Sequence, residues 1–318
     1  MTPAHRRRGV SLVEVLVVVS VCAILIALLL PAVQAARAAA DRMVCRGKLR
    51  QIGLAVQNYE STVGRLPPAF QHNRPTDPSP YPHLQWPLLI APYLELEPNW
   101  QMVEADYRKS RDVFLPTPHR GVGLPLKPFS CPSDPRTAVP WEVHFLYTLA
   151  LPRPTGMTQQ IAFNSYLGNA GAVTARHDGV IVADGKVTMV GIIDGTSNTL
   201  LAGERPPPAD LHYGWLYVGW GAEPNGNGEL SSVIGVRDPN PFARFIPTPQ
   251  CGPGPFPYRQ PDLTATPDCA MFQFWSLHAG GANFAFCDGS VRFLTYSADP
   301  ILPALATRAG GEAAQIPE

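Results

Sequence analysis

The apolar positions near the N-terminus form one long run. The segment from Val15 to Ala36 contains 22 residues and no charged side chain. As an α-helix it would be about 33 Å long, enough to cross a hydrocarbon core of about 30 Å. A secretory signal peptide has a shorter apolar region. The pattern therefore predicts a membrane-spanning helix, in which Pro31 is expected to cause a kink.

After this run the pattern becomes a single apolar stripe with helical spacing. The intervals along the stripe are 4, 3, 4, 3 and 4 residues, as expected for a helix with one buried face. Gly64 suits the position after a helix end, and two prolines follow it closely. One helix is therefore predicted from about Leu12 to Val63, with its outer half packed on a sheet. The stripe consists of Cys45, Leu49, Ile52, Val56, Tyr59 and Val63.

Turn residues and short apolar segments dominate the rest of the chain. The 36 prolines and 27 glycines indicate a loop-rich body, with Pro-rich stretches at 65–83, 116–140 and 237–268. Asp-Gly pairs suit tight turns, and the segment AFCDGSVRF at 285–293 is the clearest hairpin. The predicted strands are Val143–Leu149, Gln160–Leu167, Gly179–Val182, Thr199–Glu204, Trp215–Val218, Gln273–His278, Asn283–Cys287 and Val291–Thr295.

Three shorter helical segments complete the predicted fold. Residues 83–100 read as a short buried helix or turn cluster, and residues 100–109 as a helix. Ser297 could cap a last helix from Ala298 to Arg308. The fold class is therefore α+β, with a long N-terminal helix packed on a mainly antiparallel sheet with Pro-rich loops.

The charges indicate a membrane topology and give no reason to expect nucleic-acid binding. The 25 basic and 25 acidic residues cancel. Arg6, Arg7 and Arg8 precede the apolar run, so the positive-inside rule places the N-terminus in the cytoplasm and the body across the membrane. The basic residues between Arg37 and Arg50 suit either a solvated helix face or contact with lipid headgroups and acidic neighbours.

The six cysteines show no CxxC spacing, so neither a zinc site nor a thioredoxin motif is predicted. Cys22 lies inside the apolar run and five cysteines lie beyond it. In an oxidising compartment some of these five would pair. Cys251 and Cys269 flank a Pro-rich loop and are the favoured disulfide, and at least one other cysteine must stay free or bond another chain.

Glu14 lies just inside the apolar run, where an unpaired carboxylate is costly. Either water at the headgroup level satisfies it, or a cation in the membrane plane does. The α-amine made by cutting between Gly9 and Val10 would supply such a cation.

The sequence GVSLVE at residues 9–14 resembles the type IV prepilin processing motif. The resemblance implies that a prepilin peptidase cuts after Gly9 on the cytoplasmic side and methylates Val10, where the family usually has Phe or Met. It also implies that the helix stays in the product as a filament core. Glu14, the fifth residue after the cut, would pair with the N-terminus of a neighbouring subunit.

Further segments resemble a planctomycete-type prepilin-like family, catalogued as domain of unknown function 1559, whose members look like type II secretion pseudopilins. One is an H-x9-D-G pattern, His278 with Asp288 and Gly289. They span nearly the whole chain in order. The segments are 45–69, 86–95, 129–135, 164–171, 194–205, 276–294 and 304–312.

The H-x9-D-G residues have three interpretations. A structural hydrogen bond that fixes the hairpin is favoured over a metal or ligand site, and a hydrolase dyad is disfavoured. Cys287 is the only nucleophile beside the motif, and strand alternation turns it away from Asp288. In a strand–loop–strand unit, His278 can lie near the hairpin turn.

Two other groups of residues have both a structural and a ligand-binding interpretation, and the structural one is favoured. Asp194, Ser197 and Asn198 suit a self-bonded turn more than a calcium site. Tyr213, Trp215 and Trp220 suit the core of a strand pair more than a binding face.

The predicted function is that of a membrane-anchored, non-enzymatic pseudopilin or pilin-like subunit of a type II secretion or type IV pilus-like assembly. The expected organisation is a cleaved leader (1–9), a transmembrane and spine helix (10–64) and a periplasmic or extracellular domain (65–318) with its hairpin near 276–295. The expected partners are the prepilin peptidase, other pilin-like subunits and inner-membrane lipid, without a cofactor. The alternatives are a tethered module that binds a glycan, peptide or cation, and an enzyme at the His278/Asp288 hairpin.

Overall fold

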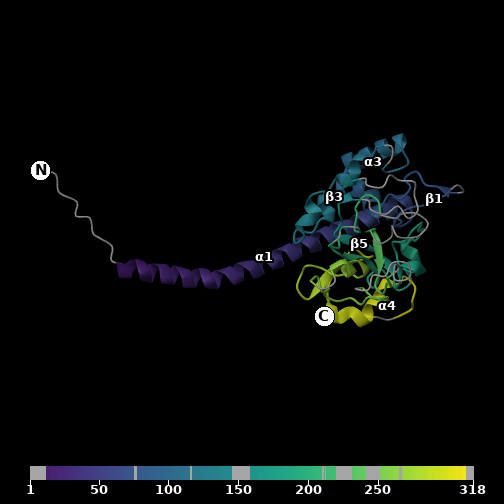
Figure 1. Ribbon diagram of the computed structural model, residues 1–318. Coiled ribbons are helices and arrows are strands. Elements are labelled where there is room, and N and C mark those ends of the chain that lie inside the picture. The colour runs from purple at the N-terminus through teal and green to yellow at the C-terminus, as the bar shows by residue number, and fades with distance from the viewer. Residues whose placement is uncertain are drawn as a thin grey trace. The chain divides into compact units, whose positions relative to one another are not determined.

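The computed structural model describes residues 12–74, 77–114, 117–144, 158–209, 211, 213–219, 231–240, 251–264 and 267–312. The chain divides into two compact units, Met1–Met43 and Val44–Glu318. The strands all lie in the second unit, which is coloured blue to yellow in Figure 1.

The predicted N-terminal helix is confirmed. Helix α1 spans Leu12–Val63, with Pro31 inside it. In the first unit the side chains of α1 are exposed as far as Ala40. In the second unit α1 buries the predicted stripe up to Val56, whereas Tyr59 is half-buried and Val63 is exposed. A single helix thus contains an exposed, largely apolar half and a second half that buries one face.

A five-stranded sheet forms the centre of the second unit, in the order β7-β5-β6-β8-β9. All neighbouring pairs are antiparallel except β5 and β7, so the sheet is mainly antiparallel and the fold is α+β, as predicted. Its strands are β5 Tyr166–Gly171, β6 Leu200–Glu204, β7 Val233–Gly235, β8 Gly281–Phe286 and β9 Val291–Thr295. Two-stranded pairs join β1 Asn73–Arg74 with β2 Asp77–Pro78, and β3 Trp141–His144 with β4 Thr158–Ile161.

Both faces of the central sheet are covered, because successive residues of a strand point to opposite faces. Ala285 and Cys287 join the larger apolar cluster, which includes α1. Phe284 and Phe286 join a second cluster with α4 Leu302–Ala306. Every residue of β8 is buried, so its sequence lacks the apolar–polar alternation of a half-exposed strand.

The remaining helices are short. The segment at 83–100 forms α2 Trp86–Leu89 and η1 Ala91–Leu94, and α3 Glu97–Lys109 follows. Both predicted helical regions are thus confirmed, with α3 starting three residues earlier than expected. Further three-ten helices are η2 Arg120–Gly123, η3 Lys127–Phe129, η4 Pro135–Ala138, η5 Thr174–Arg176, η6 Met189–Gly191, η8 Pro267–Phe272 and η9 Tyr296–Ile301.

Several predicted elements were wrong. The last helix is η9 followed by α4, because Pro300 and Pro303 lack the N–H that an α-helix needs, and Ser297 caps nothing. Residues 179–182 are buried but turn-like: the N–H groups of Val180 and Ile181 both donate to the Asn169 carbonyl. Residues 273–278 are not a strand, and residues 215–218 form only isolated bridges.

Other boundaries also moved. The predicted strand 160–167 is in fact the end of β4 and the start of β5, and β7 was not predicted. The predicted strand from Val143 coincides with β3 only as far as His144, and residues 145–149 lie outside the described residues. The same holds for residues 241–250, 265 and 266 of the Pro-rich stretch 237–268.

Candidate functional site

The apolar half of α1 is the first candidate site. It is long and apolar enough to cross a membrane, and its most apolar 18-residue window is entirely unburied. Glu14 lies in the first turn of α1 and is exposed, while Gly9 and Val10 lie outside the described residues. Since water cannot solvate so many exposed aliphatic side chains favourably, this half of the helix needs an apolar environment.

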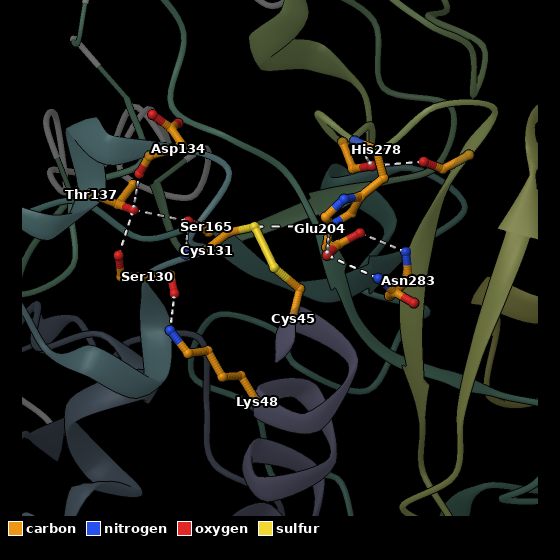
Figure 2. The surroundings of a disulfide bond; sticks show 12 residues. Cys45, Lys48, Ser130, Cys131, Asp134, Thr137, Ser165, Glu204, His278 and Asn283 are labelled. Atoms are coloured by element: carbon orange, nitrogen blue, oxygen red, sulfur yellow. Dashed lines mark hydrogen bonds and ion pairs between the residues drawn. A yellow bond between two sulfur atoms is a disulfide. The ribbon is translucent and has the colours of Figure 1, made fainter. Parts of the chain in front are cut away.

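The second candidate site is a buried cluster of four potential metal ligands in the second unit. Cys45 comes from α1, Cys131 from the loop after η3, Glu204 from the end of β6, and His278 from the segment before β8 (Figure 2). Their exposed fractions are only 0–7%. Their donor atoms all lie within 4.8 Å of one another.

The two sulphur atoms form one side of this Cys–Cys–Glu–His cluster. Cys45 and Cys131 are joined as a disulfide, with Cα atoms 5.6 Å apart, which is an ordinary disulfide separation. The Cys131 sulphur lies 3.9 Å from His278 Nε2. The disulfide ties the outer half of α1 to the loop that precedes η4.

The carboxylate and the imidazole form the other side. His278 Nε2 lies 3.3 Å from Glu204 Oε1. The backbone N–H of Asn283 donates to Glu204 Oε2 (2.6 Å), and Asn283 Nδ2 donates to Oε1 (3.1 Å). The backbone N–H of His278 donates to Ser276 Oγ (3.0 Å), whose hydroxyl donates to the Gly281 carbonyl (2.6 Å). The carboxylate of Glu204 is therefore held by Asn283 of β8, and the backbone of His278 is held by Ser276.

A polar network surrounds Cys131 as well. The Cys131 N–H donates to Ser165 Oγ (2.9 Å). The ammonium group of Lys48, one turn after Cys45 in α1, donates to the Ser130 carbonyl (Figure 2). Burial lowers the pKa of Lys48. The Lys48 side chain thus lies beside the loop that supplies one of the two sulphur atoms.

His278 and Asp288 do not form a pair, so the hypothesis that His278 lies near the hairpin turn was wrong. They flank opposite ends of β8, whose six residues span about 20 Å. Asp288 Oδ1 accepts a hydrogen bond from the Ser290 N–H (2.8 Å) inside the turn. The H-x9-D-G motif therefore serves two places: the buried cluster at one end of β8 and the turn at the other.

The Asp288-Gly289 turn packs against α1. Gln57 of α1 donates from Nε2 to the Cys287 carbonyl (3.0 Å). A Cβ added to Gly53 would lie 3.4 Å from the Gly289 Cα, so helix and turn approach closely. Gly289 has φ +82°, and a Cβ there would lie 3.1 Å from Gln57 Nε2. Both the backbone angle and the space require glycine at position 289.

We expect Gly289→Ala to lower the free energy of unfolding by about 1–3 kcal/mol, because the left-handed backbone becomes strained. Denaturant unfolding of the full chain in detergent measures this change. The matched control is Gly47→Ala in α1, where an added Cβ meets nothing within 4 Å. Alanine favours helix there by up to about 1 kcal/mol, so this variant should not be destabilised. Equal effects of the two substitutions would contradict the packing role of the turn.

The other candidate residues make contacts that stabilise the fold. Cys251 and Cys269 form a disulfide. The Asp194 carboxylate accepts from the N–H groups of Gly310 (2.7 Å) and Gly311 (2.9 Å), so it binds a distant segment and not its own turn. Within the turn, Asn198 Nδ2 donates to the Asp194 carbonyl (3.4 Å), as the turn interpretation predicts. Tyr213 and Trp215 are buried, as expected of a core, whereas Trp220 lies outside the described residues.

Cys287 is a free cysteine, and it is buried. Burial raises the pKa of its thiol, with a smaller contribution from Asp288. A thiolate, the form that attacks substrates, is therefore disfavoured at the only nucleophile beside the H-x9-D-G motif.

The sequence does not predict the cluster, although Cys45 and His278 each belong to a pattern of their own. Cys131 and Glu204 carried no local signal, since no spacing connects them with the other two residues. All four do lie in segments that resemble the prepilin-like family: 45–69, 129–135, 194–205 and 276–294. The structure shows that these four segments meet at one place.

Comparison with protein families finds two matches. Residues 34–301 match the family described as "Protein of unknown function (DUF1559)", and residues 4–30 match the prokaryotic N-terminal methylation motif. The chain therefore belongs to the DUF1559 family. Its methylation motif and long apolar helix fit a type IV pilin-like, membrane-anchored subunit. No curated protein and no solved structure matches the chain.

Proposed function

We propose that this protein is a pseudopilin or pilin-like structural subunit of a type II secretion or type IV pilus-like assembly. The observation that carries the proposal is that the methylation motif at 4–30 overlaps a helix whose apolar side chains are exposed from Leu12 onward. A helix of this kind can serve first as a membrane anchor and then as a packing surface for other subunits.

The proposed topology follows from charge. Arg6, Arg7 and Arg8 keep the N-terminus in the cytoplasm, where the prepilin peptidase cuts after Gly9 and methylates Val10. The helix then crosses the inner membrane once. The domain from residue 65 onward lies in the periplasm or outside the cell, where a disulfide such as Cys251–Cys269 persists.

Assembly would depend on Glu14. A carboxylate within an apolar helix is stabilised by a cation in the membrane plane, and the new N-terminus of a neighbouring copy supplies one. This ion pair sets the axial register between helices that otherwise associate through packing of Val, Leu and Ala side chains. The role is structural and non-enzymatic.

The test is Glu14→Ala. We expect the variant to insert into the membrane normally but to lose association with other copies. Co-purification of two differently tagged copies from membranes measures the association, and oxidative cross-linking through the exposed Cys22 of α1 provides a second readout.

Asp41→Ala is the matched control, because Asp41 is an acidic residue of the same helix beyond the apolar run. It should leave both readouts unchanged. Equal co-purification of the wild-type and Glu14→Ala chains would overturn the proposed role of Glu14 in assembly.

A further inference from the structure

We propose that Cys45, Cys131, Glu204 and His278 form a binding site for a zinc-type divalent cation when the two cysteines are reduced. The metal-bound state and the Cys45–Cys131 disulfide are then alternative states of one buried centre. The inference rests on the Cys–Cys–Glu–His cluster alone and does not depend on the proposed role in assembly.

The distances within the cluster suit a tetrahedral site. Zinc–ligand bonds of about 2.0–2.3 Å place tetrahedral ligands about 3.4 Å apart for nitrogen and oxygen, and about 3.6 Å apart for sulphur and nitrogen. The corresponding separations here are 3.3 Å between His278 Nε2 and Glu204 Oε1, and 3.9 Å between Cys131 Sγ and His278 Nε2. These two separations, which join three of the four donor atoms, are close to those of a tetrahedral zinc site.

The two sulphur atoms must separate for a metal to bind. Tetrahedral thiolates on zinc lie about 3.8 Å apart, whereas bonded sulphur atoms lie about 2.05 Å apart. Reduction of the disulfide followed by side-chain rotation would provide this added separation of about 1.7 Å. Rotation about the Cα–Cβ bond moves each Sγ atom and leaves the backbone of α1 and of the loop after η3 in place.

The donor set selects the class of metal. Two thiolates, one imidazole and one carboxylate are ligands that zinc accepts, whereas calcium and magnesium take oxygen ligands. All four positions come from the protein and all four residues are buried, so no coordination site remains open to substrate. The site is therefore a structural metal centre and not a catalytic one.

The surroundings supply what a buried metal site needs. Both oxygens of Glu204 accept hydrogen bonds from Asn283, which orients the carboxylate. Two thiolates and one carboxylate carry three negative charges, of which a divalent cation neutralises two. The Lys48 ammonium beside the Ser130 carbonyl partly offsets the third.

Conversion between the two states balances as a two-electron exchange. The two metal-bound thiolates each give up one electron and form the Cys45–Cys131 bond, and the metal leaves as a divalent cation. The electrons reduce the disulfide of a thiol–disulfide carrier, which takes up two protons and becomes a dithiol. In both states the outer half of α1 stays attached to the loop after η3.

The experiment uses the full chain in detergent, with Cys251→Ser and Cys269→Ser to remove the second disulfide. One sample is purified with a phosphine reductant and one is oxidised. Each is dialysed against Zn2+, and bound zinc is measured by mass spectrometry of the metal. Co2+ is then used as a spectroscopic probe, because thiolate ligation gives intense charge-transfer bands.

We expect about one zinc per reduced chain and none per oxidised chain. Binding should be lost in Glu204→Gln and in His278→Gln. It should weaken about 10- to 100-fold in Asn283→Ala, which removes the side-chain support of the carboxylate. His177→Gln is the control: this exposed histidine lies outside the cluster, so zinc binding should not change.

A second measurement covers the case in which a variant fails to fold. In the unsubstituted reduced chain, zinc should slow alkylation of Cys45 and Cys131 but not of Cys251 and Cys269. A reduced, folded chain that binds no zinc would overturn the proposal. So would zinc binding that ignores the Glu204 and His278 substitutions, or a Cys45–Cys131 disulfide that cannot be reduced without unfolding the chain. Each of these outcomes would mean that Cys45 and Cys131 form a permanent structural disulfide and that the cluster is not a metal site.

Discussion

Replacing Gly9 with valine should abolish processing, so that the chain recovered from membranes keeps all 318 residues. The wild-type chain should instead start at Val10, with one added methyl group. The physical reason is that glycine has no side chain, which leaves the peptide bond after it open to close approach by the peptidase. The effect should be all-or-none, because an uncut chain has no α-amine at Val10 to modify. Intact mass and N-terminal sequencing measure both changes.

The matched control is Val10→Phe, which introduces a residue usual at this position in type IV prepilins and keeps Gly9. It should be cut and methylated at least as completely as the wild-type chain. A wild-type chain that starts at Met1 would contradict the processing hypothesis. The apolar helix would then be a signal anchor, and a tethered binding module would become the better interpretation of the domain.

The elements that follow one periodicity could be predicted from the sequence. α1 is an example, because its stripe from Cys45 to Val56 repeats at helical spacing and is buried as expected. The β8–β9 hairpin is another, because Asp288-Gly289 specifies a tight turn between two apolar segments. In both cases the signal is local, because the residues that determine the element lie close together in the sequence.

The elements that failed depend on tertiary contacts. Residues 179–182 have the composition of a buried strand, but their N–H groups converge on one carbonyl of β5 instead of forming a ladder. β7 has only three residues and owes its existence to parallel pairing with β5 across more than 60 positions of sequence. No local pattern distinguishes these two outcomes, because burial alone fixes neither the direction nor the partner of a short segment.

Of the two candidate sites, one could be predicted from a local sequence signal and the other depends on tertiary contacts. The N-terminal motif is contiguous and could be identified from six residues. The Cys–Cys–Glu–His cluster brings together residues 45, 131, 204 and 278, and only the packing of α1 on the sheet makes them neighbours. The spacing between His278 and Asp288 favours a contact within one hairpin. The partner of His278 is Glu204 at the end of β6, the strand that pairs with β8.

Because Glu204 is buried, the His278→Leu variant should be strongly destabilised in the oxidised state. The substitution leaves the carboxylate of Glu204, with an exposed fraction of 2%, facing an apolar side chain where the imidazole had been 3.3 Å away. Asn283 remains as a donor, but a buried group that loses one of its polar partners typically costs about 1–3 kcal/mol, and more when the group is charged. We expect a loss of about 3 kcal/mol in the free energy of unfolding. Denaturant unfolding of the full chain in detergent, with the Cys45–Cys131 disulfide intact, measures it.

The double variant His278→Leu with Glu204→Met tests the cause of the destabilisation. It distinguishes a buried carboxylate that has lost its partner from a simple loss of packing. It removes the buried charge together with its partner, and such replacements by apolar residues of similar volume often restore stability. The double variant should therefore be more stable than His278→Leu alone, by about 1 kcal/mol or more, although Asn283 loses its acceptor. If the double variant is instead less stable than the single one, the contact between His278 and Glu204 does not govern the stability of this end of the sheet. Because the disulfide stays closed throughout, this outcome is independent of metal binding.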